Sequence, residues 1–316
     1  MKLLITGGAG YIGSHVVRAA VAAGHECVVV DNLSTGIRGR VSVRLHELDL
    51  SHHQAQSELE GLMRKENFDS VIHLAALKQV GESVQEPERY FAENLGGLAN
   101  LLSAMRATNL TSLVFSSSAA TYGMPDVDLV GEDYPGVPIN PYGQTKLIGE
   151  WMVRNAKVWG LRGVNLRYFN VAGCGHSDLA DTAALNLIPI AIEAIRAGEA
   201  PKVFGSDYPT PDGSCIRDYV HVQDLAEAHV AAVDYLNRAD QQFDTFNVGT
   251  GAGASVFQVL EQLRIASKID FEIDVTDRRA GDPPKLVADV ALIRHVLGFE
   301  AKYGLEEIVQ SAWDAS

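Results

Sequence analysis

The chain has 316 residues, of which 47% are hydrophobic and 21% charged. Its 26 basic and 40 acidic side chains give a net charge of −14, which argues against nucleic-acid or membrane-surface binding, since either would need a basic face. No apolar run approaches the roughly 20 residues that span a bilayer. The start lacks the apolar core of a signal peptide, so we expect a cytoplasmic protein. Three scattered cysteines show neither metal-ligand spacing nor a disulfide framework.

Short apolar runs alternate with helical patterns in the first half of the chain. The runs that we predict as strands are Lys2–Thr6, Glu26–Asp31, Leu45–Leu48, Ser70–Ala75, Leu113–Ser116 and Gly163–Phe169. The stretches with helical spacing are Tyr11–Ala23, Ser51–Glu66, Ser83–Thr108 and Pro141–Trp159. Nearly continuous apolar strands that alternate with helices predict an α/β fold, a doubly wound parallel sheet.

After Asn170 the pattern loosens, and one further apolar strand, Thr245–Val248, could return to the main sheet. Helices are predicted at Leu187–Ala197, Val222–Arg238, Ser255–Ala266, Val290–Leu297 and Leu305–Asp314. We predict a Rossmann domain from residues 1–170 plus about 217–250, and a smaller α/β C-terminal substrate lobe from about 171–216 and 251–316. A ligand cleft is expected between them.

The segment Ile5–Gly13 directly follows a predicted strand, opens a helix and carries three spaced glycines. Gly7 permits a tight turn, Gly10 lets the backbone approach a pyrophosphate, and Gly13 allows close packing of the helix on the strand. The helix N-terminus adds N–H groups and partial positive charge for the phosphates. These features predict a dinucleotide-binding turn.

The second predicted strand ends at Asp31, 18 residues beyond Gly13. A carboxylate at this place can accept both hydroxyls of the adenosine ribose and would repel a 2′-phosphate, so we predict NAD rather than NADP. Asp31 could instead only cap a loop. Asp49 and Leu50, at the end of the third strand, are placed to meet the adenine.

The segment Asn140–Lys146 is typical of a helix start, with Asn140 as N-cap and Pro141 at the first helical position. Tyr142 and Lys146 are then neighbours on one helix face. An ammonium near a phenol lowers the phenol's pKa, so Tyr142 is predicted as a general base. A lone Tyr-x-x-x-Lys pair is usually a surface contact, but the upstream nucleotide turn favours the catalytic interpretation.

The run Val114–Ser118 is an apolar strand that ends in hydroxyl groups. Because the carboxyl ends of parallel strands face the ligand crevice, we expect Ser118 to hydrogen-bond the reacting substrate hydroxyl and to relay its proton. Ser116 and Ser117 could instead belong to a serine-rich turn without chemistry.

These motifs resemble those of the extended short-chain dehydrogenase/reductase superfamily and, within it, the UDP-glucose 4-epimerase family. The resemblance covers nearly the whole chain. The segments that carry it are Gly7–His15, Asp31–Leu33, Ala75–Ser83, Phe115–Gly123, Pro141–Lys146, Leu166–Asn170, Phe204–Val222 and Arg278–Asp282. The first and fifth are general to the superfamily, whereas Ala75–Ser83 and the stretch from Asp207 to His221 are much more specific.

The resemblance implies an NAD-dependent enzyme that inverts C4 of a UDP-hexose, UDP-glucose or UDP-galactose, through a 4-keto intermediate. Tyr142, assisted by Ser118, would remove the proton of the 4-hydroxyl while the C4 hydride passes to NAD. NADH would then return the hydride to the opposite face of the sugar, so the cofactor is regenerated and can stay bound. The resemblance also implies a homodimer formed through helices in Ser83–Thr108 and Pro141–Trp159.

The resemblance further implies which residues surround each ligand, and no metal. The cofactor set is Gly7, Gly10, Tyr11, Ile12, Gly13, Asp31, Asn32, Leu33, Ser34, Thr35, Gly36, Asp49, Leu50, Leu74, Ala75, Ala76, Lys78, Asn94, Ser116, Tyr142, Lys146 and Phe169. The UDP-sugar set is Lys78, Ser118, Tyr142, Asn170, Asn186, Leu187, Val203, Phe204, Arg217, Arg279, Asp282 and Leu286. Arginines suit a pyrophosphate because they bind it with bidentate geometry. Arg217 could instead pair with Asp218 or Asp224, and Arg279 could be a solvated loop charge.

Several alternatives stay open at this point. Leu286 stands where the family often has Tyr, or a small residue in members that accept N-acetylated sugars, and the stretch Val171–Leu185 is shorter than usual. A UDP-glucuronate or UDP-N-acetylhexosamine 4-epimerase is therefore an alternative. A 4,6-dehydratase would need an acidic pair after Ser118, where alanines stand, and a non-catalytic NAD-binding regulator would typically lack Tyr142 or Lys146.

Overall fold

In the computed structural model, which describes residues 1–183, 185–238, 243–279 and 281–316, the chain forms two units. The first comprises Met1–Tyr122, Gly136–Arg167 and Ala226–Phe246, and the second Gly123–Pro135, Tyr168–Leu225 and Asn247–Ser316. Among the described residues, no helix has both the length and the apolar character that crossing a membrane requires.

The first unit is built on a seven-stranded sheet with the order β10-β6-β5-β4-β1-β2-β3. Its strands are β1 (Lys2–Thr6), β2 (Glu26–Asp31), β3 (Arg44–Glu47), β4 (Ser70–His73), β5 (Ser112–Ser118), β6 (Arg162–Tyr168) and β10 (Phe243–Val248). Strand β1 runs parallel to both neighbours, with Leu4 opposite Val28 on one side and Val71 on the other. The predicted doubly wound sheet is confirmed, and the apolar runs gave the bounds of β1 and β2 correctly.

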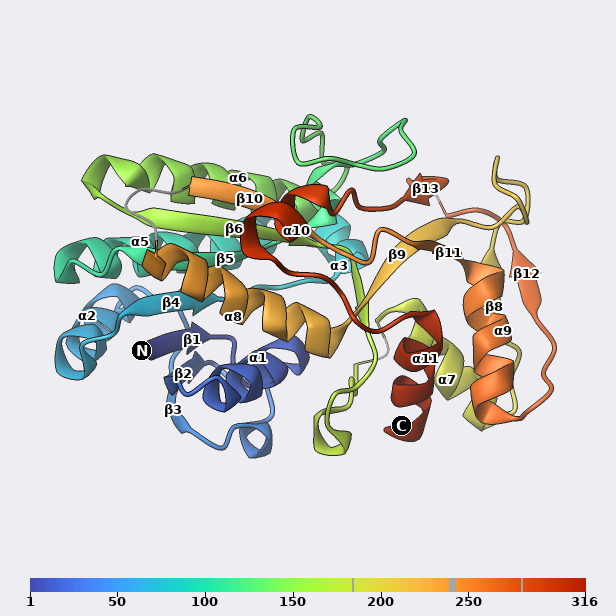
Figure 1. Cartoon of the computed structure of the whole chain (residues 1–316), viewed down its shortest axis with the longest axis horizontal. Helices are drawn as coiled ribbons and strands as arrows, with labels where there is room; N and C mark the ends of the chain where they lie inside the picture. Colours follow the sequence, from blue (N-terminus) through green and yellow to red (C-terminus); the bar gives the residue numbers. More distant parts are fainter. Residues whose placement is uncertain (184, 239–242, 280) are drawn as a thin grey trace. The chain divides into compact units, whose positions relative to one another are not determined.

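Helices cover both faces of this sheet (Figure 1). One face carries α2 (Ala55–Glu66), α5 (Gly96–Thr108) and α6 (Pro141–Asn155), and the other α1 (Tyr11–Ala22) and α8 (Val222–Arg238). Leu59 of α2, Leu101 of α5 and Val153 of α6 are fully buried in one shared core. On the opposite face, His25 just after α1 lies 4.0 Å from Asp234 of α8. The strands of this sheet are therefore held between two helical layers.

Two predicted helices are wrong in extent. The single helix expected over Ser83–Thr108 is instead α3 (Val80–Gln85), α4 (Pro87–Tyr90), a π-helical turn (Phe91–Leu95) and α5. Pro87 has no N–H and fits only a first helical turn, so a new helix begins there. Helix α2 starts at Ala55 rather than Ser51, because Asp49 accepts the N–H and the hydroxyl of Ser51 at 2.8 and 2.7 Å in a competing local turn.

The second unit is centred on strand β9 (Ile216–His221). Its sheet neighbours are β11 (Gly253–Ser255), which is antiparallel, and the parallel strands β13 (Lys285–Leu286) and β7 (Asn170–Ala172). A separate parallel pair consists of β8 (Lys202–Phe204) and β12 (Asp274–Thr276). The main helices are α7 (Leu187–Ala197), α9 (Val256–Ser267), α10 (Ala291–Leu297) and α11 (Leu305–Asp314). Helices α7, α9 and α11 share a core around the buried Tyr219 of β9.

Candidate functional site

The glycine turn between β1 and α1 is fixed by close approaches that only glycine permits. Gly7 has φ +73°, and a Cβ there would lie 2.6 Å from the backbone N of Ala75. A Cβ on Gly13 would lie 2.0 Å from the carbonyl O of Gly7. Helix α1 begins after Gly10, and no side chain caps it. The positive end of α1 is therefore left for an anionic ligand, as the phosphate-binding interpretation requires.

Gly10 differs from Gly7 and Gly13, because a Cβ built on Gly10 meets only the carbonyl O of Gly7, at 3.5 Å. The described residues therefore leave the space beside Gly10 open. Gly10→Ala should shift Tm by less than about 3 °C but weaken NAD binding about tenfold or more. Calorimetric titration of NAD into NAD-free protein measures this, and Gly13→Ala, which clashes with the backbone, is the control that should lose stability as well. An unchanged NAD affinity in Gly10→Ala would remove the turn from the cofactor site.

Asp31 is buried at the end of β2 and braces the glycine turn. Its Oδ2 accepts the N–H of Ala9 and its Oδ1 the N–H of Leu33, each at 2.9 Å. A carboxylate offers about four acceptor sites, so both oxygens retain capacity for ribose hydroxyls. Asp31 thus caps a loop and still fits the predicted role toward NAD.

The loop after β2 meets the end of β3, where the adenine end of the cofactor is predicted. Asn32 donates to Asp49 Oδ2 at 3.4 Å and accepts the hydroxyl of Ser34 at 2.7 Å. Leu50 is 7% exposed and packs in the core, so little of its side chain faces outward. The other predicted cofactor residues at these strand and helix ends are Tyr11, Ile12, Leu33, Thr35, Gly36, Leu74 and Ala76.

Asn94 links the loop after β4 to helix α6. Its Oδ1 accepts the N–H of Leu77 at 2.8 Å, and its Nδ2 donates to the carbonyl of Leu77 at 3.1 Å and to Thr145 Oγ1 at 3.0 Å. Since both amide hydrogens are used, Asn94 holds the loop in place rather than offering donors to a ligand. Lys78, the next residue of this loop, is exposed and makes no hydrogen bond or ion pair with any residue that the structure describes.

Tyr142, Lys146 and Ser118 lie together, the first two on α6 and the third at the end of β5. The phenol of Tyr142, 7% exposed, is within hydrogen-bonding reach of the Ser118 hydroxyl. Lys146 is 4% exposed, and its Nζ donates to the carbonyl O of Ser116 at 2.8 Å. The same Nζ lies 5.9 Å from the centroid of the Tyr142 ring. The three side chains thus form one buried cluster.

The expected lowering of the Tyr142 pKa by Lys146 is wrong for this structure. Burial raises the pKa of Tyr142, and the hydrogen bond with Ser118 lowers it only in part. Burial also lowers the pKa of Lys146 to about 8, while the carboxylate of Glu150 acts to raise it. The ammonium is directed at the carbonyl of Ser116 rather than at the phenol, so desolvation dominates at Tyr142.

Ser116 and Ser117 are fully buried within β5, so the alternative that they belong to a serine-rich turn is wrong. The Ser116 hydroxyl hydrogen-bonds His229 Nε2 at 2.8 Å, and its carbonyl is taken by Lys146. Little of Ser116 is left for the predicted contact with the cofactor. Ser117 Oγ donates to Glu150 Oε1 at 2.5 Å.

Three buried polar side chains near the catalytic cluster were not predicted. Glu150, 1% exposed, forms a bidentate ion pair with Arg167 of β6. His73 of β4 hydrogen-bonds Thr6 Oγ1 at 2.7 Å, and burial lowers its pKa to about 3, so it is neutral near neutral pH. The sequence contained one signal for Glu150: it stands four residues after Lys146, which places both side chains on the same helix face.

In the second unit, Arg217 and Asp282 come together as the predicted UDP-sugar set requires. Arg217 Nη1 donates to the carbonyls of Ile216 and Pro283 at 2.9 and 2.7 Å, and Nη2 lies 3.4 Å from Asp282 Oδ1. Leu286 stands opposite Arg217 in the β9–β13 register. The carbonyls orient the guanidinium, while among the described residues one weak contact, with Asp282, neutralises its charge.

The alternative partners proposed for Arg217 are engaged elsewhere. Asp218 Oδ1 accepts the N–H and the hydroxyl of Thr250 at 2.8 and 2.7 Å. Asp224 Oδ2 accepts the N–H groups of Lys302 and Tyr303, each at 3.1 Å. Both carboxylates therefore brace loops of the second unit.

Arg279 lies over the ring of Phe204, with the guanidinium carbon 3.6 Å from the ring centroid. The side chain of Arg279 is still exposed, so the alternative of a solvated loop charge stays open, while the contact brings two predicted UDP-sugar residues together. Ala280, within the same motif, lies outside the described residues. Val203 is fully buried in the core of the second unit, so it exposes no surface to a ligand in this structure. The remaining predicted residues lie in β7 (Asn170), just before it (Phe169), and at the start of α7 (Asn186, Leu187).

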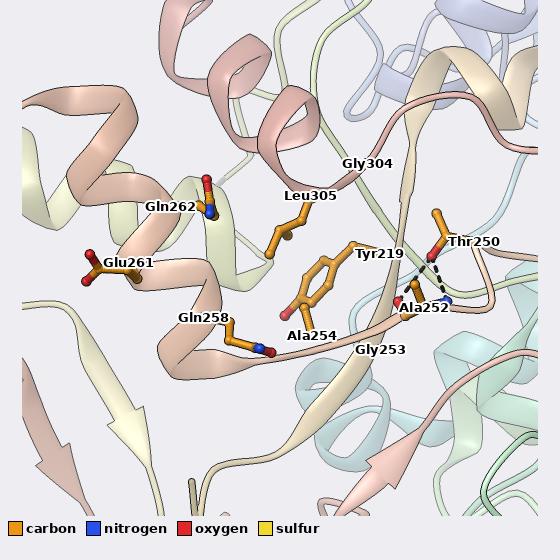
Figure 2. A pocket seen from close by; sticks show the side chains of 10 residues that line it. All are labelled: Tyr219, Thr250, Ala252, Gly253, Ala254, Gln258, Glu261, Gln262, Gly304 and Leu305. Atoms are coloured by element: carbon orange, nitrogen blue, oxygen red, sulfur yellow. Dashed lines mark hydrogen bonds between the residues drawn. The ribbon is translucent and has the colours of Figure 1, made fainter. Parts of the chain in front are cut away.

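A cavity of about 280 Å³ lies elsewhere in the second unit (Figure 2). Tyr219, Thr250, Gln258 and Leu305 are among the side chains that line it. None of the predicted UDP-sugar residues is part of its lining. The described residues also contain no cluster of His, Cys, Asp and Glu suited to a metal ion.

Comparison with known proteins gives consistent relatives. Residues 3–249 match the model of the NAD dependent epimerase/dehydratase family. The UDP-glucose 4-epimerase of Azospirillum brasilense is 44% identical over 100% of this chain and 92% of its own length. The UDP-glucose 4-epimerase from Brucella ovis in complex with NAD has a TM-score of 0.94 and 42% identity, over 99% of this chain and 97% of that one. The UDP-Glc/GlcNAc 4-epimerase from Campylobacter jejuni has a TM-score of 0.87 and 40% identity, over 99% and 98% of the two chains.

Proposed function

This chain belongs to the NAD dependent epimerase/dehydratase family and is an epimerase that uses NAD, and from that premise we propose that it interconverts UDP-glucose and UDP-galactose by inverting C4 of the hexose. The observation that carries the proposal is the buried cluster of Tyr142, Lys146 and Ser118. It pairs a proton acceptor with a cation and a hydroxyl relay, which an oxidation at a sugar hydroxyl needs. The names of the relatives supply the substrate class.

The residues proposed to hold NAD fit that cofactor. The room left at Gly10 and the uncapped start of α1 suit a pyrophosphate, and Asp31 suits a ribose diol. When bound, NAD supplies a hydride acceptor and donor and, in its oxidised form, a positive ring charge that favours a nearby phenolate. This charge opposes the effect of burial on Tyr142.

We assign each catalytic side chain one task. Tyr142 takes the proton of the substrate's 4-hydroxyl and later returns it. Ser118, within reach of the phenol, hydrogen-bonds that hydroxyl and relays the proton. Lys146, fixed by the Ser116 carbonyl, retains donors for a ribose hydroxyl and keeps positive charge beside Tyr142.

The UDP moiety is assigned to residues of the second unit. Arg217 and Arg279 neutralise the pyrophosphate, which guanidinium groups bind with bidentate geometry. Phe204, stacked under Arg279, and Asp282, beside Arg217, complete the set. Tight binding of the nucleotide with looser binding of the sugar would let the oxidised sugar turn over before it is reduced again.

A panel of UDP-sugars tests this proposal. The purified protein should carry NAD and interconvert UDP-galactose and UDP-glucose without added reductant. The panel should include UDP-N-acetylglucosamine, which the name of the Campylobacter jejuni relative supports as an alternative, and UDP-glucuronate. A 4,6-dehydratase is disfavoured because Ala119 and Ala120 follow Ser118 where an acidic pair would stand. Turnover of the N-acetylated sugar alone, or of none, would overturn the assignment.

We further propose a homodimer that works in the cytoplasm. Trp151 of α6 and Val158 just after it are 51% and 84% exposed, whereas Leu98 and Leu102 of α5 belong to the core. Exposed apolar side chains on one helical segment suit an association surface. No disulfide occurs in the described part of the chain, as in proteins of a reducing compartment. Sedimentation of the holoprotein at twice the chain mass of 34.1 kDa is expected.

A further inference from the structure

Glu150 is almost fully buried, yet its carboxylate has no part in the proposed reaction. Its Oε1 accepts Ser117 Oγ at 2.5 Å and Arg167 Nε at 2.8 Å, and its Oε2 accepts Arg167 Nη2 at 2.7 Å. Arg167 in turn lies over the buried ring of Tyr122, 4.8 Å from its centroid. A buried ion pair often contributes little net stability compared with apolar residues. Stability alone therefore does not explain the Glu150–Arg167 pair.

The position of Glu150 gives that reason. It lies one turn after Lys146 on α6, on the same helix face, and two turns after Tyr142. Its hydrogen bond to Ser117 holds the strand residue between Ser116, whose carbonyl takes Lys146, and Ser118, which reaches Tyr142. One carboxylate therefore connects the catalytic helix to the catalytic strand end.

Resting on the proposed function, we propose that Glu150 is a positioning residue that keeps Lys146 protonated and fixed against β5 during turnover. Its negative charge, one helical turn away, offsets the desolvation of the ammonium. Arg167 orients the carboxylate so that this charge stays where Lys146 needs it. Without Glu150, burial alone would act on Lys146.

Among the described groups around Lys146, the carboxylate is that of Glu150. The titratable and charged groups that interact with Lys146 itself are Tyr142 and Glu150 on α6 and His73 on β4. Behind them lie Arg167 of β6, paired with Glu150, Tyr122, whose ring contacts Arg167, and His229 of α8, which hydrogen-bonds Ser116. The ring of Phe115 lies 5.3 Å from the ammonium. Glu150 acts to raise the Lys146 pKa, so its removal should lower that pKa below about 8.

The test compares wild-type holoenzyme with Glu150→Gln and with the double variant Glu150→Gln/Arg167→Met. The double variant leaves no buried arginine without its partner, so we expect it to fold even if the single variant does not.

The Lys146 pKa is followed by NMR of ¹³Cε-labelled lysine, with the signal identified by its loss in Lys146→Arg. A lysine is charged below its pKa, so a lower pKa moves the loss of charge to lower pH. We expect the titration midpoint of Lys146 to fall by about one pH unit. The pH above which kcat for UDP-galactose declines should fall by a similar amount.

Val153→Ala provides the matched control, since it opens the core on the same helix without changing charge. It should leave the midpoint unchanged although the protein is less stable. An unchanged Lys146 midpoint in both Glu150 variants would overturn the proposal and leave the ion pair a structural feature. The NMR readout needs no substrate, so a wild type that leaves UDP-galactose unconverted overturns the proposed function and not the role of Glu150.

Discussion

Tyr142→Phe should lower kcat for UDP-galactose epimerisation by about 100-fold or more while the purified protein still carries NAD. The substitution removes only the phenolic oxygen, and with it the proton acceptor that lies within reach of Ser118. The ring stays in its buried place on α6, so the cofactor turn and the Asp31 loop are untouched. Initial rates with UDP-galactose, together with the NAD released on denaturation, measure both parts of the expectation.

Tyr235→Phe is the matched control for this loss. Its hydroxyl donates a hydrogen bond to Asp244 at 2.7 Å, and it lies on α8, outside the catalytic cluster. It should cost about 1 kcal/mol of unfolding free energy and leave kcat within about twofold of wild type. Near-normal turnover in Tyr142→Phe would show that another group removes the proton. Loss of NAD from that variant would show instead that Tyr142 serves binding.

Much of the fold could be predicted from periodicity and local signals. The bounds of β1, β2, α7, α8 and α11 agree with the apolar pattern. The start of α6 could be predicted because a helix cap depends only on residues that are close in sequence. Asn140 Oδ1 accepts the N–H of Gly143 at 2.8 Å, and Pro141 follows at the first helical position. The glycine turn was readable for the same reason.

What could not be predicted depends on contacts between distant residues. Arg217 has acidic neighbours nearby in sequence, yet the carboxylate beside it is Asp282, 65 positions along the chain. The raised pKa of Tyr142 follows from burial, which no spacing on a helix reveals. The close packing of α5 is similar, since a Cβ on Gly97 would lie 3.2 Å from Leu50 Cβ, so glycine here lets α5 approach a loop from another part of the chain.

Arg217→Met should raise KM for UDP-galactose by about 10- to 100-fold, which corresponds to the loss of one or two hydrogen bonds to a charged group. Methionine keeps much of the length of the side chain and removes the charge that the carbonyls of Ile216 and Pro283 orient. The reaction chemistry belongs to Tyr142 and its neighbours, so kcat should fall much less than KM rises. Steady-state kinetics with UDP-galactose separate the two effects.

Arg278→Met controls for the loss of an arginine from the same unit. Arg278 is paired with Asp207 and lies over the ring of Tyr208, 4.2 Å from its centroid, so its charge is already satisfied by the protein. Its KM should stay within about twofold of wild type. The contrast matters because, in the described part of the chain, Arg217 has one contact with a carboxylate, at 3.4 Å, and is held mainly by neutral carbonyls. The protein orients the guanidinium of Arg217 but leaves most of its charge uncompensated, and a pyrophosphate can neutralise that charge. Equal KM values in the two variants would show that another cation binds the pyrophosphate.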